Sequence, residues 1–264
     1  MVAIKITVLK RELFKEIVDT YSNLDIKKCG MFKDGQEFIA GINSMPDGFC
    51  NWAWNDISKM VLALFTGGKF DQEAFSGWNG WMKQDNTAIA CCTDGFRPVV
   101  FKLERINTKS LFDLSKVKDP APLDVYESER WGEFSYTLPN LSSDIMYLVR
   151  LHFCEVYHMA KGKRRFNVEL NGKPILENFD IFTEAGGAYK PIIKEFTTTA
   201  DKDGNIVLNF VKGMDDLPKL TAIEIIQTTK DMVGKSSYAI NAGGKACEIF
   251  SKDSFYNGGN GLSD

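Results

Sequence analysis

Five short segments in the second half of the chain constrain its fold most, because each is rich in β-branched and aromatic residues and is bounded by turn residues. Asn171-Gly172 predicts a tight hairpin, since both central positions of such a turn need positive φ, and Asp203-Gly204 repeats the signal. Short strands at this spacing are typical of an antiparallel sandwich. The predicted strands are 146–153, 164–170, 192–199, 205–211 and 222–227.

The first 107 residues predict a different kind of unit, a small α+β domain. An alternating strand over 2–9 leads into a helix over 11–21, whose apolar residues recur at helical spacing. Asn55 or Asp56 can cap a second helix that ends at Gly67-Gly68. A strand over 36–40 and a hairpin over 87–104, turning at Thr93-Asp94-Gly95, complete the predicted domain.

A connector separates these two regions. Pro120 and Pro122 can continue neither a helix nor a central strand, so we place a boundary beside them. The predicted organisation is an α+β domain at 1–107, a linker at 108–121, an all-β antiparallel sandwich at 122–228, a linker at 229–236 and a terminal segment at 237–264.

The predicted sandwich contains five short strings that resemble the malectin family in order and spacing. They are Tyr126-Glu-Ser-Glu-Arg-Trp-Gly, Leu151-His-Phe-Cys-Glu-Val-Tyr-His, Arg165-Phe-Asn-Val-Glu-Leu-Asn-Gly, Asn178-Phe-Asp-Ile-Phe and Gly213-Met-Asp-Asp-Leu-Pro. The resemblance covers about residues 120–228. It implies a carbohydrate-binding β-sandwich of jelly-roll type that does no chemistry on its ligand.

The resemblance resumes at residue 237 with what looks like the opening strand of the same module, Tyr238-Ala-Ile-Asn-Ala-Gly-Gly-Lys-Ala. Residues 237–261 then complete the sandwich in cis, as in a circular permutation, or begin a second module, or pair in a neighbouring molecule as a strand-swapped dimer. The linker of about ten residues spans roughly 30 Å when extended, which permits each outcome. We expect pairing in cis, because a missing first strand leaves an open sheet edge.

A sugar site needs an aromatic face for the C–H side of a pyranose and polar groups for its hydroxyls. By resemblance to malectins, which contact a glucose disaccharide, these roles fall to Trp131, Tyr157, His158 and Asp216. Animal malectin has Tyr where this chain has Trp131, and Phe where it has His158. The implied ligand is a glucose-containing di- or oligosaccharide.

Two other functions stay open from the residues. The carboxylates Glu129, Glu155, Asp180 and Asp216 could supply the two acids of a glycoside hydrolase, which stand about 5 to 10 Å apart. A protein-interaction module could use the same aromatic face. Against these uses, Glu129 and Arg130 are expected to pair with each other, and Asp180 to bond turn amides. Asp215 and Asp216 either contribute to the sugar site, through Asp216, or form no more than a solvated turn.

The cysteines of the first domain are expected to be small buried hydrophobic residues. The alternative is a thiolate metal site or a reactive thiol drawn from Cys29, Cys50, Cys91 and Cys92. On a strand, Cys91 and Cys92 point to opposite faces, so at most one of them can join the others. Trp52 and Trp54 are expected to pack in the core. Strings at Met45–Ile57 and Ala90–Phe101 resemble a small uncharacterised family of anaerobic bacteria and archaea, which implies no activity.

Composition excludes some partners. The net charge is −3 and the longest basic run is Lys163-Arg164-Arg165, so we expect no nucleic acid ligand. No apolar stretch approaches the roughly 20 residues of a membrane helix. With six cysteines and no cleavage site after the first strand, the chain is expected to be cytoplasmic and reduced, without a cofactor.

Overall fold

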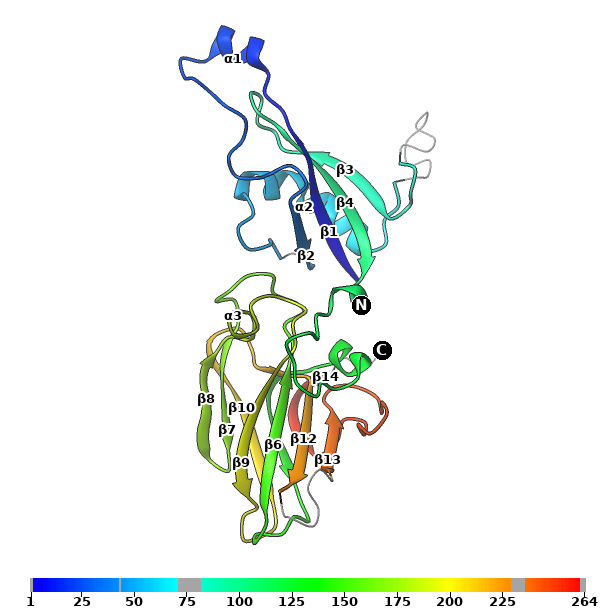
Figure 1. Ribbon diagram of the computed structural model, residues 1–264, viewed down its shortest axis with the longest axis vertical. Helices are drawn as coiled ribbons and strands as arrows, with labels where there is room; N and C mark the ends of the chain where they lie inside the picture. The colour runs from blue at the N-terminus through cyan, green and yellow to red at the C-terminus, as the bar shows by residue number, and fades with distance from the viewer. Residues whose placement is uncertain (1, 43, 71–81, 229–235, 262–264) are drawn as a thin grey trace. The chain divides into compact units, whose positions relative to one another are not determined.

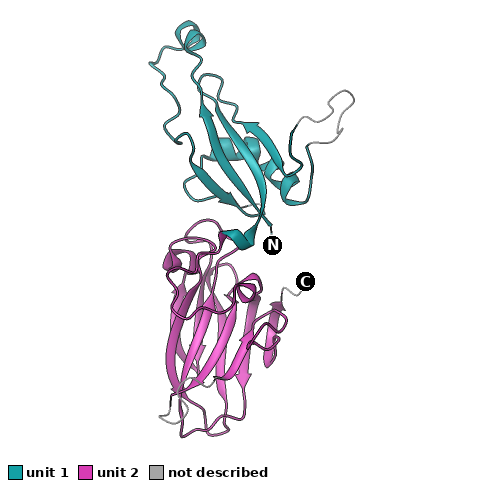
Figure 2. Cartoon of the chain, turned by 45° about the vertical axis from the view of Figure 1, so that its right-hand side comes forward, with its two compact units in different colours: residues 1–110 teal, residues 111–264 magenta. Residues whose placement is uncertain are grey.

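The computed structural model describes residues 2–42, 44–70, 82–228 and 236–261. The chain forms two compact units, unit 1 at residues 1–110 and unit 2 at residues 111–264 (Figure 2). Each has its own apolar core.

Unit 1 is a four-stranded antiparallel sheet with a helix packed against it (Figure 1). The strand order is β2-β1-β4-β3, with bounds β1 Val2–Arg11, β2 Glu37–Ala40, β3 Thr87–Cys91 and β4 Val99–Asn107. Ile4, Ile6 and Val8 alternate with more exposed residues along β1, so one face of the sheet is buried. Helix α2, Asn51–Phe65, covers that face with Ile57 and Leu64. The α+β architecture is as predicted.

Helix α1, Lys15–Tyr21, differs from the predicted helix over 11–21. The chain stays extended through Arg11 because that residue pairs with Val99 on β4. Val18 is the buried residue of α1, while Ile17 and Tyr21 are exposed. The apolar residues do recur at helical spacing, but only part of the face that they form is buried.

The start of α2 was also predicted wrongly. The helix begins at Asn51, with Cys50 at the N-cap position, rather than after Asn55 or Asp56. The extra turn forms because it buries Ala53 and packs Trp54 against the core. Asp56 is inside the helix, and its carboxylate accepts hydrogen bonds from the backbone N–H and the hydroxyl of Thr93, at 2.8 and 2.9 Å.

The described residues of unit 2 form two antiparallel sheets around one core, which confirms the predicted sandwich. One sheet has the order β11-β5-β10-β7-β8, with β14 also paired to β5, and the other has the order β13-β12-β6-β9. Two 3-10 turns, Thr108–Leu111 and Leu123–Glu127, precede the strands. The bounds are β5 Arg130–Leu138, β6 Met146–Phe153, β7 Arg165–Leu170, β8 Lys173–Phe179, α3 Ile181–Ala185, β9 Ile192–Thr199, β10 Ile206–Asp215, β11 Lys219–Leu220, β12 Ala222–Gln227, β13 Ser236–Asn241 and β14 Tyr256–Gly261.

Of the two hairpin turns predicted for unit 2, one is present. Asn171 and Gly172 have φ of 48° and 72° and connect β7 to β8. Asp203-Gly204 is not a hairpin turn, because β9 and β10 belong to different sheets. There the positive φ is confined to Gly204, at 77°.

The C-terminal segment adds a strand to each of the two sheets of unit 2. β13 pairs with β12 in one sheet and β14 pairs with β5 in the other. Between them the chain passes so close to β5 that a Cβ on Gly243 would lie 1.9 Å from the carbonyl oxygen of Glu129. Within this single chain, both strands thus pair with the rest of unit 2.

Candidate functional site

Asp216 joins two loops at one end of unit 2. It lies in the turn between β10 and β11, and its Oδ2 is 2.6 Å from Nε2 of His158, in the loop that follows β6. A guanidinium nitrogen of Arg164 lies 3.2 Å from the same carboxylate oxygen. Burial disfavours the charged carboxylate, but the hydrogen bond from His158 and the charge of Arg164 outweigh this and lower the pKa of Asp216. Asp216 is therefore an ionised acceptor at neutral pH.

The two predicted aromatic residues border the same loops. The ring of Tyr157 meets that of His158 edge-on, with centroids 4.9 Å apart. Trp131 on β5 pairs with Lys219 on β11, and the N–H of Gly132 donates to the carbonyl of Pro218, so Trp131 lies beside the turn that holds Asp216. Trp131 is 37% exposed and Tyr157 47%. The residues Trp131, Tyr157, His158 and Asp216, here called the rim site, come from neighbouring segments and leave aromatic surface open.

The buried side chain of Glu155 holds the backbone of two rim-site residues, Tyr157 and His158. Its Oε1 accepts the N–H groups of Tyr157 and His158 at 3.0 and 3.1 Å, and its Oε2 accepts from Nε of Arg164 at 2.8 Å. Burial opposes ionisation of Glu155, but the positive charges of Lys219 and Arg164 overcome it and hold the pKa of this carboxyl at about 2. The carboxylate thus stays charged, and both loop amides keep their acceptor.

Sequence reasoning missed these partners. Glu129 was predicted to pair with Arg130, but it pairs with the buried Lys219. Arg130 instead binds Asp253 from the C-terminal segment, with Nε 2.8 Å from Oδ2. Asp215 pairs with Arg165, and both side chains stay more than one-third exposed. The sequence does place an acidic residue, Glu155, just after the apolar strand that ends at Phe153. Such a residue needs a cationic partner when it is buried, but the sequence does not say which cation that is.

The carboxylates of Glu129, Glu155 and Asp180 do not support the alternative function of a two-acid glycoside hydrolase. Glu129 and Glu155 are buried and face the ammonium of Lys219. Asp180 caps α3 by accepting from the N–H of Thr183, and it also accepts from the N–H of Gly162 at 2.7 Å, the turn-amide role that was predicted. A general acid has to hold a proton near neutral pH, which a carboxyl with a pKa of about 2 does not do.

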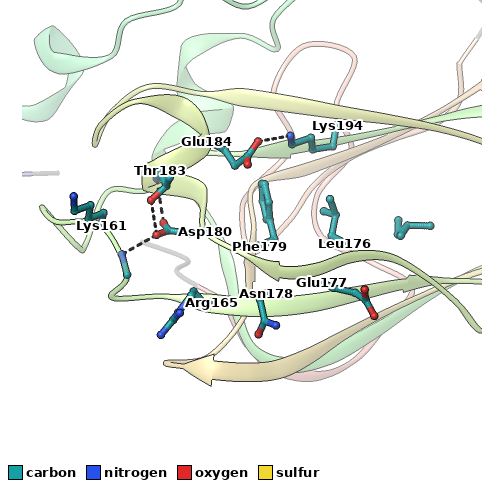
Figure 3. Close-up of a pocket in the computed structure, with 12 residues that line it drawn as sticks. Lys161, Arg165, Leu176, Glu177, Asn178, Phe179, Asp180, Thr183, Glu184 and Lys194 are labelled. Atoms are coloured by element: carbon teal, nitrogen blue, oxygen red, sulfur yellow. Dashed lines mark hydrogen bonds and ion pairs between the residues drawn. The ribbon is translucent and has the colours of Figure 1, made fainter.

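A groove of about 540 Å³ lies between α3 and the β7–β8 hairpin (Figure 3). It borders the rim site's loop through Lys161 and Gly162, and Glu184 pairs across it with Lys194 at 2.8 Å. Its aromatic residue, Phe179, is 5% exposed. The groove therefore provides polar contacts and little aromatic face.

The thiols of unit 1 do not assemble into a site. Cys29, Cys50 and Cys92 pack against the apolar core, whereas Cys91 is exposed. Across the described ranges, no three His, Cys, Asp or Glu side chains are grouped as metal ligands. Nor does any helix in this part of the chain have the length and apolar character to cross a membrane.

Comparison of the sequence with known proteins identifies a family that it matches. The model of the malectin domain family matches residues 67–224, a range that begins inside unit 1. Malectin of Homo sapiens is 32% identical over 133 residues, 44% of this chain and 44% of that protein. Malectin-B of Xenopus laevis is 30% identical over 128 residues, 44% of this chain and 46% of its own length. The chain thus spans less than half the length of these relatives.

Among solved structures, the ANX2 ectodomain from Arabidopsis thaliana is 22% identical with a TM-score of 0.40, covering 44% of this chain and 37% of that one. The family match carries the assignment, because it extends over more than half of the residues. The chain belongs to the malectin domain family.

Proposed function

We propose that the rim site binds a neutral, glucose-containing di- or oligosaccharide. The observation that carries this proposal is the contact of Asp216 with His158 at 2.6 Å, which brings an ionised acceptor beside open aromatic residues. Trp131 and Tyr157 supply faces on which a pyranose stacks, and Asp216 accepts hydrogen bonds from its hydroxyls.

The site is organised before the sugar arrives. Glu155 holds the backbone of Tyr157 and His158, and Arg164 joins Glu155 to Asp216. Little conformational entropy is then lost on binding, which favours recognition by a shallow surface. We expect an affinity between millimolar and micromolar, about −4 to −8 kcal/mol.

The test is a glycan array followed by calorimetry with the strongest hit and with maltose. Trp131→Ala removes a stacking surface worth about 0.5–1.5 kcal/mol beyond its buried area, so the affinity should fall about tenfold. Asp216→Asn removes the charged acceptor and should weaken binding similarly. Tyr21→Ala, which changes an exposed aromatic residue of unit 1, is the matched control.

Equal affinity in all variants would place the ligand elsewhere. Release of shorter sugars during incubation would instead favour hydrolysis, and an empty array would favour a protein partner for the aromatic face.

A further inference from the structure

Trp52 of unit 1 is held in a fixed orientation although it is not buried. It lies in the first turn of α2 and is 58% exposed, while its neighbour Trp54 packs against Phe49 in the core. The indole Nε1–H of Trp52 donates to the hydroxyl of Thr93 at 2.8 Å, and that hydroxyl donates in turn to Asp56 at 2.9 Å. The polar edge of the ring is therefore satisfied within the protein, and a face stays open.

The open ring borders a groove of about 480 Å³, here called the Trp52 groove. The other walls are residues 24–27 and the turn between β3 and β4, with Phe96 and Ile26 as apolar lining. A volume of a few hundred Å³ is typical of small-molecule sites. All these residues belong to unit 1, so the groove is separate from the rim site.

The charges around the groove balance. Asp25 lies 3.7 Å from the ammonium of Lys27, and Asp94 lies 3.3 Å from Nε of Arg97. Two acids and two bases give no net attraction for a phosphate or a uronate. Arg97 is half-exposed, and the far end of its guanidinium can donate to hydroxyl groups.

We propose that the Trp52 groove is a second sugar-binding site, which takes a neutral hexose stacked on Trp52. A fixed aromatic face beside charge-balanced hydrogen-bonding groups matches a pyranose, whose apolar C–H face is ringed by hydroxyls. An apolar peptide side chain is the alternative occupant, and it would use the ring without the polar rim. The proposal does not rest on the function of the rim site.

The test uses the full chain labelled with 5-fluorotryptophan and observed by ¹⁹F NMR during titration with maltotriose, cellotriose or mannotriose. Trp52→Phe, Trp54→Phe and Trp131→Phe assign the three resonances by their loss. We expect at least one sugar to shift the Trp52 resonance saturably, with a dissociation constant in the millimolar range, while the Trp54 resonance stays in place. Because Trp131 reports the rim site separately, each site can fail without the other.

Thr93→Val provides a second measurement. It frees the indole of Trp52 by removing the hydroxyl that holds it, so the sugar response of Trp52 should weaken several-fold while that of Trp131 is unchanged. A Trp52 resonance that none of the three sugars moves at tens of millimolar would overturn the proposal. So would a resonance that shifts with a leucine-rich peptide and with no sugar.

Discussion

At the residue scale, Glu155 contributes both to the stability of unit 2 and to the geometry of the proposed rim site. A buried carboxylate is strongly unfavourable unless cations and hydrogen-bond donors surround it, and Glu155 has Arg164, Lys219 and two loop amides. The same contacts hold Tyr157 and His158 in the rim site. One side chain therefore sets both the local fold and the geometry offered to a ligand.

The pKa of Glu155 predicts an acid-dependent loss of stability. Its folded pKa of about 2 lies below the ordinary value of 4.5, so the unfolded chain takes up the proton first as the pH falls. The contribution to stability is complete above about pH 5 and is lost as the pH falls towards 2. Urea unfolding of unit 2 at a series of pH values should show this decline.

Glu155→Gln should destabilise the protein by about 3 kcal/mol at neutral pH, because two buried cations lose a partner, and should flatten the acid dependence. Glu184→Gln, which alters an exposed pair with Lys194, is the control and should leave the profile unchanged. The same acid slope in Glu155→Gln and the wild type would exclude this role.

At the element scale, the carboxylate of Asp253 links the C-terminal segment to β5, in addition to the pairing of β14 with β5. Asp253 accepts from Arg130 at 2.8 Å, from the hydroxyl of Tyr136 at 2.7 Å and from the N–H of Gly243 at 2.7 Å. An ion pair whose members are 123 positions apart therefore adds to the strand pairing that holds this segment in place.

Asp253→Ala should lower the unfolding free energy by about 3–5 kcal/mol, since it leaves the guanidinium of Arg130 buried without its carboxylate. Asp203→Ala, in an exposed turn, is the control. Deleting the chain after residue 228 should uncover an edge in each sheet and cause association. Thermal melting and size-exclusion chromatography measure both effects.

A truncated chain that stayed monomeric with an unchanged melting temperature would contradict the assignment of these strands. A wild-type protein that elutes as a dimer and becomes monomeric after the deletion would indicate pairing in trans.

At the scale of the whole molecule, the chain should divide at residue 110 without loss of sugar binding by the rim site. Each unit has its own core, and the described strands of each sheet belong to one unit. A protein of residues 111–264 should therefore fold and bind the same sugar with the affinity of the full chain, by calorimetry. A loss of binding would mean that residues 67–110, which lie inside the family match, contribute to the domain.

The sequence by itself determined the features that depend on neighbouring residues. Alternating β-branched and aromatic residues predicted the described strands of unit 1 and the strands β6, β7, β9, β10 and β12 of unit 2, but not β5 or β11. Asn171-Gly172 predicted its hairpin because positive φ is a local requirement. The five strings that resemble the malectin family predicted the rim-site residues from the sequence alone. Asp203-Gly204 shows the limit of such signals, since a turn motif does not say whether the next strand returns to the same sheet.

Tertiary structure decided which residues meet across long separations. The spacing over 11–21 was helical, yet α1 exposes most of its apolar residues, because burial depends on what lies opposite a helix. Likewise Glu129 and Arg130 are adjacent in the sequence but pair with Lys219 and Asp253, because neighbours on a strand point to opposite faces. Packing, rather than local preference, chooses the partner of a buried charge, and that choice positions the rim site.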